Sequence, residues 1–231
     1  MKLIVFGATG DVGRKITEEA LACGHSVTAV ARNTQPLARI QGQIERVDAD
    51  LLANAERAGE LITGHDAAIS ALRPAQGREP LLLELTRAVL DGARANDVPV
   101  FVTGGAATLK LPEGRGQTLL SAPGVLPAAV RPIAEACAAQ VELLDATEEP
   151  AWFHLLPPAM LVEGPRTGIY GWGTDTLVTD ADGNSQISYA DFAAAMLDLV
   201  ESPPPAPIRC TVAWQASGQP PAEREAESAP E

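Results

Sequence analysis

The sequence is poor in cysteine, histidine and basic residues, and each shortage argues against a class of function. Three histidines stand far apart and three cysteines show no C-x-x-C spacing, so neither a metal site nor a redox dithiol is expected. Cys23, Cys137 and Cys210 lie in apolar segments and are expected to be buried small hydrophobic residues. With 17 basic and 30 acidic residues the net charge is −13, which makes nucleic acid an unfavourable partner.

Long hydrophobic runs are also missing. No apolar stretch reaches the roughly 18 residues that span a membrane, and Met1-Lys2 leads straight into an apolar strand without the pattern of a secretory leader. We therefore expect no membrane partner and a cytoplasmic location. The 231 residues suit one sizeable α/β core, which we place at residues 1–214 as a single domain. Residues 215–231 consist mostly of Pro, Ala, Ser and Glu and are predicted to form a disordered acidic tail.

Strand and helix patterns alternate through the first two thirds of the chain. Short apolar runs predict strands at residues 3–6, 27–31, 44–47, 67–70, 99–103 and 151–156. Helical spacing predicts helices at residues 12–23, 35–41, 52–62, 79–96 and 133–147. This alternation predicts a doubly wound parallel Rossmann sheet with helices on both faces.

The later segments depart from simple alternation. Residues 111–132 are rich in Pro and Gly and are interpreted as a lid over the site or as an ordinary surface excursion. Residues 164–182 suggest a small hairpin-like insertion on the substrate side, in which Arg166 binds an anion or pins the insertion to a carboxylate. Ser188 and Asp191 resemble a capping box for a helix that ends near residue 200. A last strand is predicted at residues 208–214.

A glycine-rich turn follows the first strand directly. Gly7, Gly10 and Gly13 are spaced three apart, between a buried strand and the start of a helix. Unpaired amides and a partial positive charge at a helix start bind pyrophosphate. The turn predicts a dinucleotide site that also includes Thr9, Asp11 and Val12.

The end of the second strand indicates which dinucleotide is bound. An acidic residue at this position selects NAD, whereas an arginine accommodates the 2′-phosphate of NADP. The chain has Arg32 there and no acid, and a guanidinium matches phosphate geometry. NADP(H) is therefore favoured over NAD(H).

Other loops at the carboxyl ends of strands should line the same crevice. These loops are Asp50-Leu51, Ser70-Ala71-Leu72-Arg73, Thr103-Gly104-Gly105 and Leu156-Pro157-Pro158-Ala159. Asp50 is expected near the adenine, and residues 70–72 beside the pyrophosphate and nicotinamide ribose. Gly104 and Gly105 would let the backbone approach the nicotinamide.

These motifs together resemble a known family. The motifs are Gly7-Ala8-Thr9-Gly10-x-x-Gly13, Ala31-Arg32, Asp50-Leu51, Gly104-Gly105-Ala106-Ala107-Thr108-Leu109 and Trp152-Phe153-x-x-x-Pro157-Pro158-Ala159. They are similar to those of the atypical short-chain dehydrogenase/reductase group, and more narrowly of its NAD(P)H-binding, NmrA-like branch that includes biliverdin-IX-beta (flavin) reductase. The resemblance covers roughly residues 1–214. It implies a Rossmann core, NADP(H) binding, and either a small-molecule reductase or a redox-sensing role.

The proton donors of that superfamily are missing. Its ordinary members use a Tyr-x-x-x-Lys pair, but neither Tyr170 nor Tyr189 has a lysine four residues later. Gly105 stands where the biliverdin-reductase-like members have a serine. Two candidates remain. Thr108 is either a hydrogen-bond donor to substrate or a turn hydroxyl, and His154 is either a titrating group or a hydrogen-bonded, packed histidine.

The sequence therefore predicts an NADPH-dependent oxidoreductase for a small flat or carbonyl acceptor, such as a flavin, quinone or tetrapyrrole. The alternative is a non-catalytic NADP(H)-sensing regulator of the NmrA type. An isomerase or epimerase with tightly held cofactor is less favoured, because the Tyr-Lys pair is absent. The expected partner is a small-molecule substrate, and the expected assembly is a monomer or homodimer.

Overall fold

The main sheet has eight strands, and all but one run parallel. The computed structural model describes residues 1–114, 116–206 and 208–215, so the predicted tail lies outside it except for its first residue. The strand order is β3-β2-β1-β4-β5-β6-β10-β8. The parallel strands are β1 (Lys2–Phe6), β2 (Ser26–Ala31), β3 (Ile44–Asp48), β4 (Ala67–Ser70), β5 (Val100–Thr103), β6 (Trp152–Leu156) and β10 (Ile208–Ala213). The edge strand β8 (Gly171–Gly173) is antiparallel to β10. The predicted doubly wound parallel fold is confirmed.

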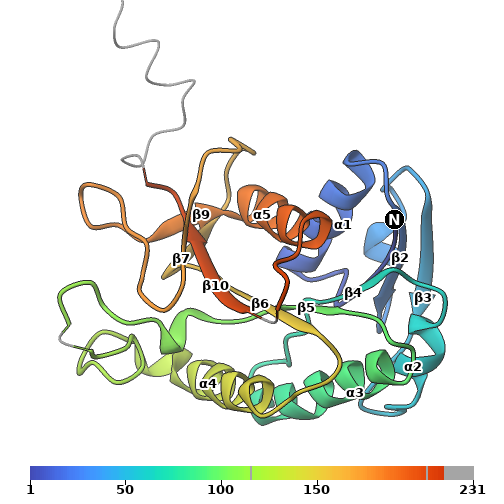
Figure 1. The fold of residues 1–231 in the computed structure, drawn as a ribbon, viewed down its shortest axis with the longest axis horizontal. Coiled ribbons are helices and arrows are strands. Elements are labelled where there is room, and N and C mark those ends of the chain that lie inside the picture. The colour runs from blue at the N-terminus through green and yellow to red at the C-terminus, as the bar shows by residue number, and fades with distance from the viewer. Residues whose placement is uncertain (115, 207, 216–231) are drawn as a thin grey trace, which may run out of the picture.

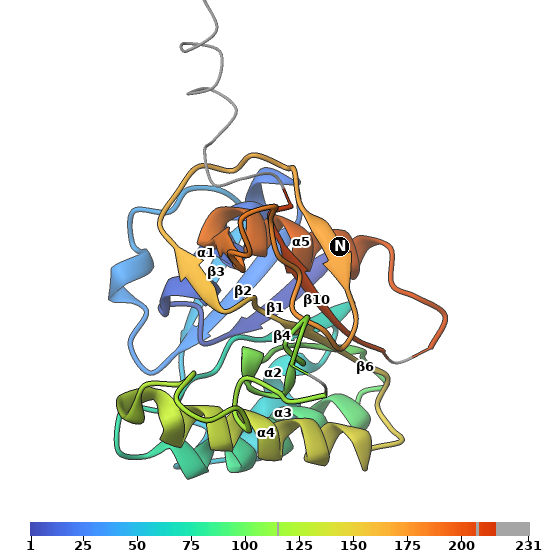
Figure 2. The ribbon, with the colours of Figure 1, turned by 90° about the vertical axis from the view of Figure 1, so that its left-hand side faces the viewer.

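Helices cover both faces of this sheet, as Figures 1 and 2 show. One face carries α1 (Asp11–Ala22) and α5 (Tyr189–Glu201), and the other carries α2 (Arg57–Ile62), α3 (Leu82–Arg94) and α4 (Arg131–Asp145). Residues 3–6 of β1 are all apolar because both faces of this strand are covered. Leu3 and Val5 belong to the core under α1 and α5, whereas Ile4 and Phe6 belong to the core on the opposite face. A strand covered on both sides has no polar face.

The helices α1 and α5 are parallel neighbours. α1 leads from the end of β1 back to the start of β2, and α5 leads to the start of β10, so both run toward the amino edge of the main sheet. Their carboxyl ends are joined by His25, whose Nε2 lies 2.8 Å from Oε1 of Glu201. The two helices have 12 and 13 residues, so their amino ends both lie toward the carboxyl edge of the sheet.

Two predicted helices are shorter in the structure, one of them because of local side-chain bonds. Asp50 Oδ1 accepts the amide of Leu52 and Asn54 Oδ1 accepts that of Arg57, so turns occupy the segment before α2, which begins at Arg57 rather than residue 52. The helix predicted at residues 35–41 is a single 3-10 turn, Gln35–Leu37. No helix in the described part of the chain is long and apolar enough to cross a membrane.

The predicted hairpin in residues 164–182 is wrong. The strand β7 (Met160–Val162) pairs in parallel with β9 (Gln186–Ser188) in a separate two-stranded sheet. The strand β8, which lies between them in sequence, joins the main sheet through β10. Short β-type runs had suggested local pairing, but their partners lie far away in the chain.

Candidate functional site

The glycine turn after β1 is packed so tightly that two of its three glycines cannot be replaced without movement. Gly7 has φ +80°, and a Cβ on it would lie 2.4 Å from the carbonyl oxygen of Ala71. A Cβ on Gly13 would lie 2.1 Å from the carbonyl oxygen of Gly7. These two glycines bring α1, the turn and the loop after β4 together.

The third glycine leaves open space at the amino end of α1. A Cβ on Gly10 would meet only the carbonyl oxygen of Gly7, at 3.5 Å, and Gly10 itself is exposed. The first helical hydrogen bond runs from the amide of Arg14 to the carbonyl of Gly10, and no side chain caps this end. The amides of Asp11 and Val12 therefore have no partner within the helix. Free amides beside open space suit a pyrophosphate.

A cavity of about 230 Å³ lies against this turn. It brings together many of the residues predicted to bind cofactor. These are Gly7, Thr9, Gly10, Arg32, Asp50, Leu51, Ala71 and Leu72. They come from the carboxyl ends of β1, β2, β3 and β4, so the crevice forms where parallel strands end.

Three arginines line the cavity, although the chain as a whole is acidic. They are Arg32 at the end of β2, and Arg73 and Arg78 in the segment after β4. Within the described residues none of these side chains forms an ion pair or a hydrogen bond. The sequence identified Arg32, and placed Arg73 in a crevice loop without a role. It gave no signal for Arg78, which follows a Pro/Gly turn.

Other predicted cofactor residues lie outside this cavity. Ser70 is buried in β4, and the Thr103 hydroxyl donates to its carbonyl at 3.2 Å. Pro157 and Pro158 are buried after β6. Packing within the protein also requires glycine at positions 104 and 105. A Cβ on Gly104 would lie 2.2 Å from His154 Nε2, and a Cβ on Gly105 would lie 2.7 Å from Cys137 Sγ. Their role toward a nicotinamide stays a prediction.

The side-chain polar atoms of the two candidate proton donors are buried, although Thr108 as a residue is only half-buried. Thr108, in the 3-10 turn Ala106–Thr108, has a hydroxyl with no protein partner. His154 is fully buried in β6, and both ring nitrogens lack partners within the described residues. Burial, with a smaller contribution from the positive charge of Arg209, lowers the pKa of His154 to about 3. The imidazole is therefore neutral near pH 7 and packed in the core, but within the described residues it lacks the hydrogen bonds expected of a packed histidine.

One cysteine differs from the prediction. Cys23 follows the last residue of α1 and is exposed, because the helix ends where the chain turns at the molecular surface. Cys137 and Cys210 are buried as predicted, and burial raises the pKa of each thiol to about 11.

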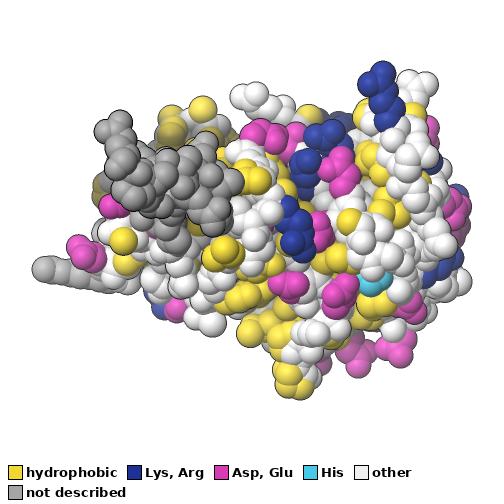
Figure 3. Space-filling model, turned by 90° about the horizontal axis from the view of Figure 1, so that it is seen from above, with side chains coloured by type: hydrophobic (Ala, Val, Ile, Leu, Met, Phe, Trp, Pro, Cys, Tyr) yellow, Lys and Arg dark blue, Asp and Glu magenta, His cyan; other side chains and the backbone are white. Residues whose placement is uncertain are grey.

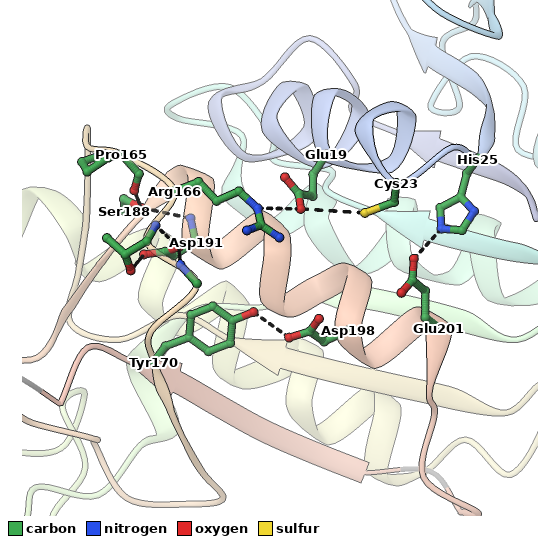
Figure 4. A network of polar contacts seen from close by, with 12 residues as sticks. Glu19, Cys23, His25, Pro165, Arg166, Tyr170, Ser188, Asp191, Asp198 and Glu201 are labelled. Atoms are coloured by element: carbon green, nitrogen blue, oxygen red, sulfur yellow. Dashed lines mark hydrogen bonds and ion pairs between the residues drawn. The ribbon is translucent and has the colours of Figure 1, made fainter. Parts of the chain in front are cut away.

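The segment of residues 163–170, called the strap below, is fastened across α1 and α5 (Figure 4). Arg166 Nε donates to Glu19 Oε1 on α1 at 2.8 Å, so Arg166 pins the insertion to a carboxylate, one of its two predicted roles. The buried carboxylate of Asp191 accepts bonds from the amides of Thr167 and Gly168, the Thr167 hydroxyl and Trp214 Nε1. Seen from above, this part of the surface mixes acidic and basic side chains (Figure 3).

The expected capping box is formed only in part. Ser188 accepts the amide of Asp191 at 3.0 Å and caps α5, as predicted. The Asp191 side chain does not return this bond, because the strap and Trp214 occupy both its oxygens. The cap residue thus starts the helix while its partner holds a segment that is distant in sequence.

The segment after β5 is anchored to the insertion. Lys110 forms an ion pair with Asp175, and its amide and carbonyl bond to the backbone of Asp175 and Leu177. Leu109, Leu119 and Leu177 cluster with Leu156 at the end of β6. The interpretation of residues 111–132 as a lid stays a prediction.

A doubly wound sheet with a glycine turn and free amides at the first helix defines a Rossmann-type NAD(P)-binding protein. The family described as NAD(P)H-binding matches residues 7–203, and the chain belongs to this family.

Three relatives cover nearly the whole chain. The uncharacterized protein YwnB of Bacillus subtilis (strain 168) is 34% identical over 219 residues, which are 94% of this chain and 100% of YwnB. A "putative epimerase" of Bacteroides thetaiotaomicron is 30% identical, with a TM-score of 0.86 and coverage of 94% and 99% of the two chains. A "putative NADH-flavin reductase" of Streptococcus pneumoniae TIGR4 is 30% identical, with a TM-score of 0.81 and coverage of 93% and 100%.

Proposed function

We propose that this protein is an NADP(H)-dependent oxidoreductase that reduces a small flat or carbonyl acceptor. The observation that carries the proposal is the cavity beside the glycine turn, where Arg32, Arg73 and Arg78 form no ion pair within the described residues, in a chain of net charge −13. Unpaired guanidinium groups beside free helix amides favour a ligand with several phosphates. A bound nicotinamide dinucleotide supplies the hydride, and the protein holds and orients it.

The preference for NADP(H) rests on Arg32. It lies at the end of β2 and lines the cavity, at the position where an acid would bind the 2′-hydroxyl of NAD. Asp48, the nearest carboxylate of the neighbouring strand β3, accepts bonds from the amide and hydroxyl of Thr34. Its Oδ1 is thus engaged within the protein, and Arg32 forms no ion pair within the described residues.

The acceptor class rests on the family and on the resemblance of the motifs. We propose a flavin, a quinone, a tetrapyrrole or a small carbonyl compound, taken up by a monomer or a homodimer. The Streptococcus relative is described as a "putative NADH-flavin reductase", so the nicotinamide preference needs a direct measurement.

Calorimetric titration with NADPH and NADH tests the cofactor. Wild-type protein should bind NADPH at least tenfold more tightly, and Arg32→Ala should weaken NADPH binding about tenfold, or about 1.4 kcal/mol, without changing NADH binding. Arg39→Ala is the matched control, because Arg39 is exposed on the same connection but lies outside the cavity. Equal loss of both dinucleotides in Arg32→Ala would contradict the assignment.

Acceptor-dependent oxidation of NADPH then tests the activity, with FMN, menadione and small carbonyl compounds as acceptors. A non-catalytic NADP(H) sensor is the second candidate, and the burial of Thr108 and His154 favours it. Tight binding without oxidation, together with different affinities for NADPH and NADP⁺, would favour the sensor, because a ligand shifts a conformational equilibrium only through differential affinity.

A further inference from the structure

The amino end of α5 presents a tyrosine at the edge of the sheet where the site lies. Because α1 and α5 are parallel, similar in length and joined at their carboxyl ends by His25 and Glu201, their first residues, Asp11 and Tyr189, lie at the same end of the helix pair. The negative charge of Asp11 acts on the phenol of Tyr189, in agreement with this placement. Asp11 directly follows Gly10, which bounds the cavity. Tyr189 therefore lies close to the glycine turn.

The hydroxyl of Tyr189 has no hydrogen-bond partner within residues 1–114, 116–206 and 208–215. Its side chain is half-buried, so the ring is supported while the hydroxyl remains free to meet a ligand. The second tyrosine behaves differently: Tyr170 donates to Asp198 Oδ2 at 2.6 Å on the outer side of α5 (Figure 4). Tyr189 also begins a helix whose cap, Ser188, fixes its backbone.

The charges that act on Tyr189 come from three elements around the site. They are Asp11 of α1, Glu163 of the strap and Arg73 of the loop after β4. Arg73 lines the cavity, so Tyr189 stands within electrostatic reach of the cavity wall. Burial, then Asp11 and Glu163, raise the pKa of the phenol above its ordinary value, while Arg73 opposes this. The hydroxyl therefore keeps its proton at neutral pH and acts as a donor.

We propose that Tyr189 is a catalytic residue that donates a hydrogen bond and then a proton to an oxygen of the acceptor. The inference rests on the proposed reductase function. The hydroxyl of Thr108 and the ring nitrogens of His154 are buried, whereas the hydroxyl of Tyr189 is one that a substrate can reach. The acceptor class it implies has a carbonyl oxygen on, or conjugated with, the reduced centre.

The step balances with one proton from the protein. The acceptor receives a hydride, which carries two electrons, from the reduced dinucleotide. As charge develops on the acceptor oxygen, the O–H bond of Tyr189 breaks and a new O–H bond forms on the acceptor. The phenolate then takes a proton from water. The sum is NADPH, acceptor and one proton giving NADP⁺ and reduced acceptor.

The two tyrosines provide a matched test. Tyr189→Phe and Tyr170→Phe each remove one hydroxyl, but only the first is expected to alter the site. With the acceptor that wild-type protein reduces fastest among FMN, menadione and small carbonyl compounds, Tyr189→Phe should lower kcat about a hundredfold. Its NADPH affinity should stay within about twofold of wild type, and Tyr170→Phe should retain wild-type kcat.

A binding measurement separates chemistry from folding. Binding of the same oxidised acceptor to the protein–NADP⁺ complex should weaken about tenfold in Tyr189→Phe, for loss of one hydrogen bond, while its thermal midpoint stays that of wild type. An active wild type with an equally active Tyr189→Phe variant would overturn the role of Tyr189 alone. If none of the acceptors tested supports NADPH oxidation by the wild-type protein, the proposed function is overturned, and the role of Tyr189 with it.

Discussion

Replacing Gly13 by alanine tests whether the glycine turn is shaped by contact within the protein as well as by its ligand. A Cβ on Gly13 would lie 2.1 Å from the carbonyl oxygen and 2.8 Å from the carbonyl carbon of Gly7. Both atoms belong to the backbone, so no side-chain rotation relieves the contact. Either α1 moves away from β1 or the turn at Gly7 opens.

The expected cost follows from two opposing effects. Overpacking a rigid site costs about 3 kcal/mol, whereas alanine in place of glycine inside a helix gains about 1 kcal/mol. The net loss of about 2 kcal/mol corresponds to a fall in thermal midpoint of about 4–8 °C for a domain of this size. Differential scanning calorimetry without nucleotide measures this loss directly.

Gly10→Ala is the control for this experiment. A methyl group there meets nothing closer than 3.5 Å, so the thermal midpoint without nucleotide should not fall, while the affinity for NADPH should fall because the methyl group occupies the ligand's space. A Gly13→Ala protein as stable as wild type would refute the packing argument. A Gly10→Ala protein with undiminished NADPH affinity would refute the placement of the pyrophosphate.

Three further predictions concern the rest of the molecule. Asp191→Ala should lose about 2–4 kcal/mol in urea unfolding, because it strips the strap donors and Trp214 of a buried acceptor; no change would refute the strap's dependence on this carboxylate. His154 has a pKa of about 3 in the folded protein against an ordinary value of 6.5. Its contribution to the free energy of unfolding is therefore complete above pH 6.5 and is lost as the pH falls, by about 1.4 kcal/mol per pH unit. The free energy of unfolding should therefore change less between pH 7 and pH 5 for His154→Leu than for wild type. An identical change in both proteins would refute the lowered pKa of His154. A thiol reagent should titrate one cysteine, Cys23, in the native protein and three after denaturation; more than one fast-reacting native thiol would contradict the burial of Cys137 and Cys210.

Patterns confined to one element were read correctly from the sequence. The β-branched and apolar runs predicted the parallel strands, because a strand covered on both faces needs apolar residues throughout. Ser188 predicted the start of α5, because capping involves residues only three apart. Where two side chains competed for backbone groups, as Asp50 and Asn54 do before α2, helical spacing alone overestimated the helix.

Roles that depend on distant neighbours could not be predicted in this way. His154 and Cys137 lie where a Cβ on Gly104 or Gly105 would stand, a requirement for glycine that the sequence did not show, while the predicted role of these glycines toward a nicotinamide stays a prediction. Asp191 looked like half of a capping box, but its oxygens are taken by the strap and Trp214.

The sequence by itself determined the parallel sheet, the glycine turn and the arginine at the end of β2, because each depends on residues within one strand–turn–helix unit. Only the tertiary structure decided that Arg73 and Arg78 share a cavity with Arg32, that His154 is sealed in the core, and that Tyr189 at the start of α5 is within electrostatic reach of Asp11 at the start of α1. The physical reason is that these relations are set by how separate units pack against one sheet, and the spacing of residues along the chain does not specify that packing.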